Sequence, residues 1–120
     1  MRASEAMAES ILAMDKVSNS YSATLPILKD VTFQQKPGEF VAVVGPSGCG
    51  KTTMLRCIAA LMQPDEGKVL HNGKVFSNPP PWLSIVFQDY NRSLFPWLSV
   101  KRNVAFGLRQ NTELDEAQIT

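Results

Sequence analysis

The sequence predicts an α/β fold, in which strands and helices alternate along the chain. Five apolar residues, Phe40 to Val44, form a run typical of a buried strand. Further along, apolar residues recur at helical spacing between Met54 and Met62. A glycine-rich stretch, Gly45 to Thr52, separates these two segments. The order strand, glycine loop, helix is the basis of the predicted fold class.

The glycine-rich stretch reads GPSGCGKT, a full match to the pattern G-x-x-x-x-G-K-[ST] that predicts a phosphate-binding loop. Its glycines let the backbone curl so that several N–H groups point at one anion. A helix that starts near Gly50 adds free N–H groups and the positive end of its dipole. The residues expected to contact phosphate are Gly45, Pro46, Ser47, Gly48, Cys49, Gly50, Lys51, Thr52 and Thr53.

Three side chains at the end of this stretch have distinct predicted roles. Lys51 places a positive charge within reach of the β- and γ-phosphates of a nucleotide, which makes it a candidate catalytic residue. The hydroxyl of Thr52 is a candidate ligand for Mg²⁺, which prefers oxygen ligands. Thr53 offers a further N–H and a hydroxyl to the phosphates.

The composition limits the function classes. A chain of 120 residues holds one modest domain, and its net charge of +1 implies no bulk attraction to nucleic acid or to anionic lipid. Cys49 and Cys57 lack metal-ligand spacing and are expected to be reduced thiols. No apolar run is long enough to span a bilayer. Because the N-terminus lacks an apolar core, it is not a secretory signal, and any membrane link is expected to come through a partner.

Strands are predicted before the glycine-rich segment. Residues 1–10 are expected to be a loose leader, followed by a strand over residues 11–17. The stretch from Ser18 to Ser22 is rich in turn-forming residues and is expected to separate this strand from a second one over residues 27–34. Residues 36–39, Lys-Pro-Gly-Glu, are expected to form a turn.

After the helix, Pro64 to Gly67 is expected to be the stop signal. Asn72-Gly73 favours a type I′ turn and predicts a hairpin between residues 68–71 and 74–76. The remaining predicted segments are a proline-rich loop over residues 77–83, a short strand over 84–88, a loop over 89–98, a helix capped by Ser99 that runs to about Leu108, and a helix that begins at Thr112.

These segments in this order resemble the nucleotide-binding subunit of an ABC transporter. GPSGCGKTT (45–53), the preceding ILKDVTFQQKPGEFVAVVG and the later IVFQDYNRSLFPWLSVKRNVAFGL (85–108) are typical of that family. The last two stretches separate it from other phosphate-loop NTPases. The resemblance implies the N-terminal half of an ABC-type nucleotide-binding domain over residues 11–120, with an antiparallel β subdomain, a truncated parallel core sheet, and ATP and Mg²⁺ as ligands.

The resemblance also implies roles for two single residues. Tyr21 lies where the family places an aromatic ring that stacks on adenine, and the alternative is a core or turn tyrosine. Gln88 lies where the family has its Q-loop glutamine, whose amide contacts Mg²⁺ or the attacking water. It is therefore a second candidate catalytic residue and metal ligand, and the alternative is an ordinary polar residue at a strand end.

Partners follow from the same resemblance. The loop from Leu94 to Trp97 lies where the family docks its transmembrane permease subunit, and the alternative is local packing of the loop. The resemblance further implies a second nucleotide-binding subunit in a homodimer, and a cytoplasmic location on the inner face of the cell membrane. PWLSVKRNVAFGL is similar to importers of nitrate, sulfonate, taurine and related anions, while importers of iron or polyamines share much of it.

Several family features are missing from the sequence. Neither Asp65-Glu66 nor Asp115-Glu116 ends an apolar strand, so both pairs are expected to be solvated charges, and no LSGGQ-type signature occurs. His71 is expected to be a surface strand residue. The chain is therefore interpreted as truncated and inactive alone, with Phe40–Val44 exposed and the isolated chain unstable. A binding module without turnover and a soluble, non-transport ABC protein remain alternatives.

Overall fold

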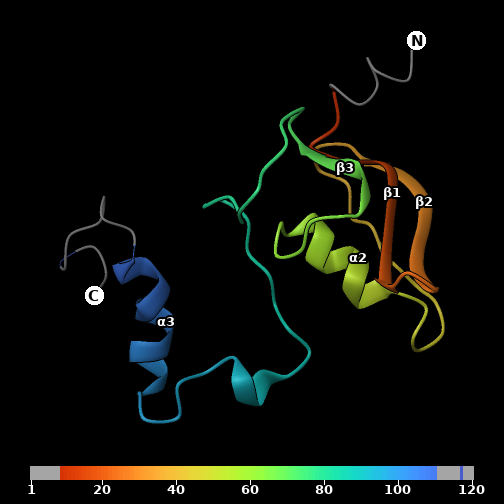
Figure 1. Cartoon of the computed structure of the whole chain (residues 1–120). Helices are drawn as coiled ribbons and strands as arrows, with labels where there is room; N and C mark the ends of the chain where they lie inside the picture. Colours follow the sequence, from red (N-terminus) through yellow and green to blue (C-terminus); the bar gives the residue numbers. More distant parts are fainter. Residues whose placement is uncertain (1–8, 111–116, 118–120) are drawn as a thin grey trace. The chain divides into compact units, whose positions relative to one another are not determined.

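The computed structural model describes residues 9–110 and residue 117. The described residues form two compact units, the first ending at Ser84 and the second beginning at Ile85 (Figure 1). Most of the helix predicted from Thr112 and most of the predicted leader lie outside the described residues. The elements are β1 (Leu12–Ser22), β2 (Leu25–Gln35), α2 (Lys51–Ile58), β3 (Glu66–His71), the 3-10 helix η1 (Tyr90–Arg92) and α3 (Val100–Arg109).

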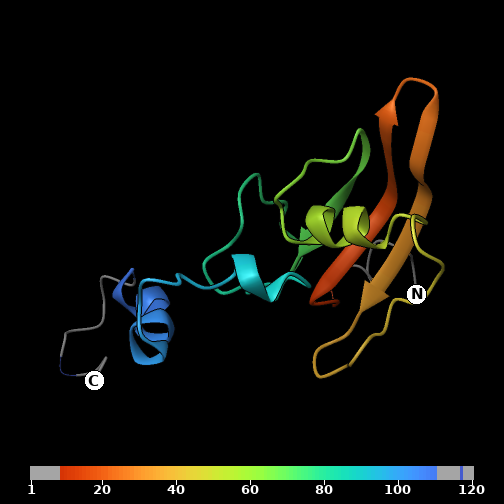
Figure 2. The ribbon, with the colours of Figure 1, turned by 90° about the horizontal axis from the view of Figure 1, so that it is seen from below.

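The first unit is an antiparallel sheet with strand order β2-β1-β3, and α2 lies across one face of it (Figures 1 and 2). This confirms the predicted antiparallel β subdomain. The sheet and the helix share one apolar core, because each contributes a single apolar face. Its buried members are Leu12, Met14, Val17, Leu28, Cys57 and Val69.

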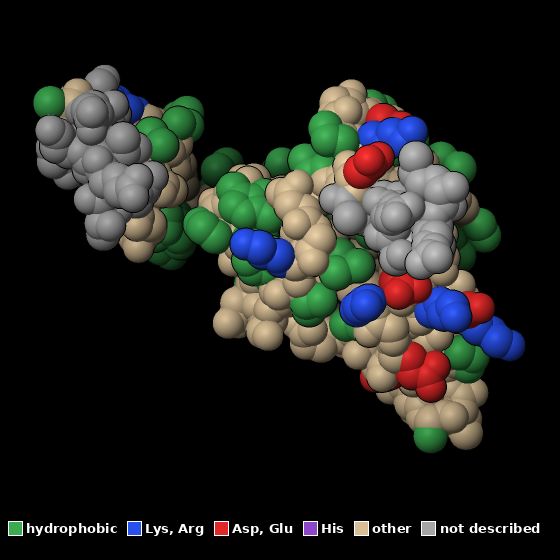
Figure 3. All heavy atoms as spheres, turned by 90° about the horizontal axis from the view of Figure 1, so that it is seen from above, with side chains coloured by type: hydrophobic (Ala, Val, Ile, Leu, Met, Phe, Trp, Pro, Cys, Tyr) green, Lys and Arg blue, Asp and Glu red, His purple; other side chains and the backbone are tan. Residues whose placement is uncertain are grey.

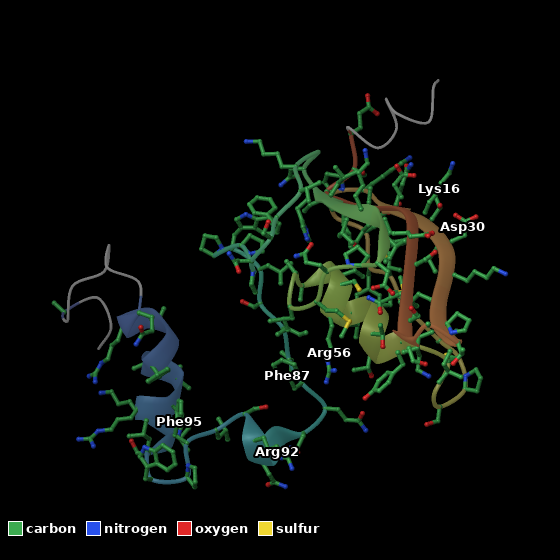
Figure 4. All side chains as sticks on the ribbon, viewed as in Figure 1. Lys16, Asp30, Arg56, Phe87, Arg92 and Phe95 are labelled. Carbon is green, nitrogen blue, oxygen red and sulfur yellow. The ribbon has the colours of Figure 1, made fainter. Side chains whose placement is uncertain are left out.

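Two β-bulges set which residues of β1 face that core. Residues three apart on a regular strand face opposite sides, yet Met14 and Val17 are both 0% exposed. The register shifts between them, at the point where Lys16 adopts a left-handed φ of 51°. Asp30 of β2, with φ 49°, marks a second shift, and Figure 4 labels both residues on their strands. Gly67 lies against the first bulge, where an added Cβ would be 2.3 Å from the Lys16 carbonyl oxygen.

The predicted strand over Phe40–Val44 is absent: this segment has no strand conformation in the structure. Phe40 is 95% exposed and Val44 is 87% exposed. A strand needs a hydrogen-bonded neighbour, and within the described residues β1 pairs only with β2 and β3. The exposure of Phe40–Val44 confirms the expectation that this apolar segment lacks its sheet neighbours.

Residues 84–88 were also expected to be a short strand, and they too have no strand conformation. Val86 is 95% exposed and Phe87 is 51% exposed, so an apolar triplet at Ile85–Phe87 again lacks a partner for pairing. The two wrong strand predictions share one cause. An apolar run shows that a segment can form a buried strand if a neighbouring strand is available to pair with it. The run itself does not show whether that neighbouring strand is present.

The boundaries of two predicted elements also differ from the structure. β1 continues through Ser22, so residues 18–22 are strand rather than turn. The helix ends at Ile58 instead of Met62, because Ala60 adopts a left-handed φ of 55° and the N–H of Leu61 turns back to the Arg56 carbonyl at 3.0 Å. Pro64–Gly67 is therefore not the stop signal of this helix.

The predicted Asn72-Gly73 turn is present, with φ values of 49° and 76°. Its second strand is reduced to one bridge between His71 and Lys74. The expectation of a surface position for His71 is wrong, because the side chain is only 3% exposed. Its Nε2 lies 2.7 Å from the Ile58 carbonyl oxygen, and its ring packs edge-on against Trp82 at 5.3 Å.

The second unit contains α3, which begins as predicted. The hydroxyl of Ser99 accepts a hydrogen bond from the Arg102 N–H at 3.3 Å, which satisfies one free donor of the first turn. Ala105 is the buried residue of the helix. Across the part of the chain that the structure describes, no helix has both the length and the apolar composition needed to cross a membrane.

Candidate phosphate-binding site

The glycine-rich loop enters α2 through two glycines with left-handed backbone angles. Gly48 has φ 81° and Gly50, the N-cap residue, has φ 102°. L side chains disfavour both conformations, so the pattern of glycines predicted this backbone correctly. Gly50 also packs tightly, since an added Cβ would lie 2.9 Å from a methyl carbon of Ile27 and 3.1 Å from one of Leu28. The loop is therefore anchored on β2.

Lys51 points back into the loop rather than out to solvent. Its Nζ donates to the carbonyl oxygens of Gly45 and Pro46 at 2.5 and 2.8 Å, and it lies 3.7 Å from the Sγ of Cys49. The N–H of Cys49 donates to the Pro46 carbonyl at 3.3 Å, which closes the turn. The ammonium group is thus held at the concave side of the loop, where the motif requires a positive charge.

The start of α2 supplies the other donors. The first hydrogen bond of the helix runs from the Met54 N–H to the Gly50 carbonyl at 2.9 Å, so the N–H groups of residues 51–53 precede the helical ladder. Thr52 is exposed and Thr53 is half-buried. The backbone donors, the ammonium and the two hydroxyls fit a polyphosphate with an oxygen-ligated divalent cation.

Tyr21 lies within β1, near its C-terminal end, and not after the strand as expected. Its ring is 85% exposed, in the same unit as the glycine-rich loop. It is therefore neither a core tyrosine nor a turn tyrosine, and its face is accessible to an aromatic ligand. Its predicted contact with adenine stays a prediction.

Gln88 is exposed and follows the unpaired segment Ile85–Phe87. Because Lys51 lies in the first unit and Gln88 in the second, their joint role at one nucleotide also stays a prediction. Within the second unit, the loop from Leu94 to Trp97 divides its side chains. Leu94 is 58% exposed and Trp97 is 75% exposed, whereas the ring of Phe95 packs against Phe106 with centroids 4.7 Å apart.

One contact near the end of β1 has no signal in the sequence motifs. The carboxylate of Asp65 accepts hydrogen bonds from the N–H and the hydroxyl of Ser20, both at 2.8 Å. These bonds lower the pKa of Asp65, the side-chain bond being the larger cause. Asp65 and Glu66 are exposed, as expected for solvated charges, and Asp65 has in addition a structural partner.

The two cysteines differ in environment. Cys49 is exposed in the loop and Cys57 is buried, and both are free thiols. Burial raises the pKa of Cys57, while a hydrogen bond from Asn19 opposes that shift. No group of three or more His, Cys, Asp or Glu side chains that could hold a metal ion occurs among residues 9–110 and 117.

Comparisons with known proteins agree on one family. A family model described as ABC transporter matches residues 28–120. A relative named spermidine/putrescine import ATP-binding protein PotA, from Acetivibrio thermocellus, is 43% identical over 102 residues, which cover 82% of this chain and 28% of the relative. The chain therefore spans less than a third of that relative's length.

Solved structures show the same likeness. cbiO1 from Clostridium perfringens, described as part of the ABC transporter complex cbiONQ, matches with a TM-score of 0.75 and 29% identity over 92% of this chain and 46% of cbiO1. A bacterial Atm1-family ABC exporter with ATP bound matches with a TM-score of 0.71 and 31% identity over 82% of this chain and 18% of the exporter. With the glycine-rich loop at the start of α2 and the family model matching most of its length, the chain belongs to the ABC transporter family, and its fold is that of the ATP-binding domain.

Proposed function

We propose that residues 11–120 are the N-terminal part of an ABC-type nucleotide-binding domain that binds MgATP and contributes to an ATPase that powers solute import. The observation that carries the proposal is the position of Lys51, whose ammonium is held at the concave side of a loop with two left-handed glycines. A phosphate oxygen attracts this ammonium more strongly than the neutral carbonyls of Gly45 and Pro46 do, because the phosphate carries a negative charge opposite to that of the ammonium.

The other residues have complementary roles in this proposal. The loop and helix N–H groups from Gly45 to Thr53 orient the phosphates, and the hydroxyl of Thr52 is a ligand for Mg²⁺. Bound Mg²⁺ would neutralise phosphate charge. Tyr21 stacks on the adenine. Gln88 contributes an amide toward Mg²⁺ or the attacking water. The exposure of Tyr21, Thr52 and Gln88 supports these roles, because each side chain is accessible to a ligand.

Nucleotide binding tests the proposal directly. We expect the chain to bind ATP in the presence of Mg²⁺, with Lys51→Ala weakening the affinity by tenfold or more. Lys74→Ala is the matched control, since Lys74 is an exposed lysine of the same unit and lies outside the loop. Affinity is measured by calorimetric titration. Equal affinities for the Lys51→Ala and Lys74→Ala variants would contradict the proposed site.

A binding module without turnover is the second candidate. The observation that favours it is the position of Asp65 in the first Asp-Glu pair. Its carboxylate accepts hydrogen bonds from Ser20, and the pair does not end an apolar strand. On this reading the 120-residue chain binds nucleotide and does not hydrolyse it. Phosphate release that depends on Lys51 would exclude the module reading, and binding without release would support it.

The proposed partners are a transmembrane permease subunit and a second nucleotide-binding subunit in a homodimer. Exposed Leu94 and Trp97 support the permease contact, because aromatic and large apolar side chains are common at interface cores. The name of the cbiONQ complex, of which cbiO1 is a part, supports the same type of assembly. Such an assembly would place the chain at the cytoplasmic face of the membrane.

The solute is the least constrained part of the proposal. The pattern PWLSVKRNVAFGL favours a nitrate-, sulfonate- or taurine-like anion. The name of the relative from Acetivibrio thermocellus supports a polyamine instead. Taurine carries a sulfonate group and putrescine does not, so uptake of radiolabelled taurine and of radiolabelled putrescine by cells with and without the gene separates the two classes.

A further inference from the structure

A single side chain holds the loop that precedes α3. The Oδ1 of Asn103 accepts a hydrogen bond from the Phe95 N–H at 2.8 Å. Its Nδ2 lies 3.1 Å from the carbonyl oxygens of Phe95, Leu98 and Ser99. Both backbone polar groups of Phe95 are therefore bonded to one amide, much as a neighbouring strand would bond them. Asn103 is itself held by α3, through its N–H and the Ser99 carbonyl at 2.9 Å.

This arrangement determines which side chains of the loop face outward. With its backbone held against α3, Phe95 packs its ring on Phe106 at 4.7 Å and on Trp97 at 5.3 Å (Figure 4 labels Phe95 beside α3). Its neighbours Leu94 and Trp97 remain 58% and 75% exposed. The loop has the short η1 before it and α3 after it. Besides the bond from the Leu98 N–H to the Phe95 carbonyl at 3.0 Å, its polar contacts with α3 run through the Asn103 side chain.

We infer that Asn103 is a positioning residue for the permease contact: it fixes the backbone of residues 95–99 so that Leu94 and Trp97 are presented as one preformed apolar surface. The inference rests on the proposed function, in which this loop meets the permease. A preformed loop binds more tightly than a mobile one, because less conformational entropy is lost on association. Truncation of Asn103 would therefore weaken association without removing any contacting side chain.

Amide hydrogen exchange of the purified chain, followed by NMR, tests the anchor itself. Asn103→Ala should lower the protection factor of the Phe95 amide at least tenfold, while the amides of Ala105 and Phe106 change less than twofold. Asn91→Ala is the matched control, because Asn91 lies in the same unit and bonds to the Asp89 carboxylate through its backbone N–H, which the substitution keeps. Unchanged protection at Phe95, or an equal loss along all of α3, would overturn the inference.

A conservative variant adds a pH-dependent readout. Asn103→Asp retains an acceptor for the Phe95 N–H but places a carboxylate near three carbonyl oxygens, which repel it. Protonation restores a donor, so protection at Phe95 should be lost at neutral pH and should recover at least threefold as the carboxyl group is protonated. A general loss of helix stability would not produce this recovery, so a protection factor that is independent of pH would overturn the inference.

A membrane-binding experiment tests the contact with the permease. It measures how much of the tagged chain is retained on washed membrane vesicles from the source cells. Asn103→Ala and Trp97→Ser should each reduce retention several-fold relative to Asn91→Ala. Loss with Trp97→Ser alone would overturn the role of Asn103 while leaving the interface intact. Loss with neither variant would overturn the proposed interface and, with it, this inference. Equal retention on protein-free vesicles of the same lipids would assign the surface to lipid and overturn both.

Discussion

The start of β1, Leu12 to Met14, and the segment Phe40–Val44 consist entirely of apolar residues, yet only the start of β1 is buried. The first three residues of β1, Leu12 to Met14, are at most 9% exposed, whereas Phe40 is 95% exposed and Val44 is 87% exposed. β1 has β2 on one side and β3 on the other, with α2 over one face. Phe40–Val44 has no strand neighbour among the described residues. Two segments of similar apolar composition therefore differ in burial. The difference arises because only one of them has neighbouring segments to pack against.

The exposed apolar side chains occur on both units. Figure 3 shows hydrophobic side chains on the surface of each unit. The exposed large hydrophobic residues include Phe40 and Val44 of the first unit and Val100 and Val104 of the second. Monomeric soluble proteins seldom expose large contiguous apolar patches, which usually mark interaction surfaces or aggregation sites. The difference between β1 and Phe40–Val44 can be tested by mutation.

The largest expected effect is on the free energy of unfolding, and it is tested with one substitution in β1 and one in Phe40–Val44. Met14→Ala should lower the free energy of unfolding by about 2–5 kcal/mol, because Met14 is 0% exposed and its truncation leaves a cavity. Phe40→Ala removes a larger side chain and should change it by less than about 0.5 kcal/mol, because that side chain is already in water. Urea titration of both variants measures the difference. A similar loss for Phe40→Ala would mean that the segment is buried in solution.

The second prediction concerns association between chains. Replacing Phe40 and Val44 together by Ser should raise the protein concentration at which light scattering begins by several-fold, since the exposed apolar segment is the expected site of aggregation. Tyr21→Ser is the control, because Tyr21 is 85% exposed on β1. An equal gain from Tyr21→Ser would show that the position of the apolar side chain does not matter.

The third prediction uses the contact that joins the end of β1 to the start of β3. Hydrogen bonds from Ser20 lower the pKa of Asp65, so this contact stabilises the fold above the ordinary pKa of an aspartate, about 3.9, and the stabilisation is lost as pH falls through the lower folded-state value. Asp65→Asn should reduce the melting temperature at pH 7 and should flatten its decline as the pH falls below about 3.9. Ser20→Ala should have a smaller effect in the same direction, because it removes the hydroxyl donor and keeps the backbone N–H that also donates to Asp65. A decline identical to that of the parent chain would contradict this assignment.

The smallest expected change in stability comes from substitutions at and near the bulges of β1 and β2. Lys16→Gly should raise the free energy of unfolding by about 0.5 kcal/mol, because relief of a left-handed φ outweighs the greater entropy of unfolded glycine. Lys29→Gly is the matched control on β2 and should lower it by about 0.5–1 kcal/mol, since Lys29 is not among the residues with positive φ. Thermal unfolding of both variants measures the two signs. The same sign for both would mean that the bulge is not strained.

The candidate site was more predictable from sequence than the fold around it. The pattern from Gly45 to Thr52 correctly predicted a glycine loop that leads into a helix, and Ser99 correctly predicted the start of α3. These features depend on local backbone chemistry, which a short sequence specifies. Burial of His71 beside Ile58 and the position of Tyr21 inside β1 were not predicted, because they depend on segments distant in the chain.

The sequence by itself determined the glycine-rich loop and the Asn72-Gly73 turn, since each rests on residues within a short stretch. It also determined the membership of the family, which rests on a match over residues 28–120. Only the tertiary structure decided that Met14 and Val17 share one core, that Asn103 anchors Phe95, and that Phe40–Val44 stays exposed. The physical reason is that a backbone angle or a cap is a local property. Burial and strand pairing are properties of two segments at once, and they exist only where the second segment is in place.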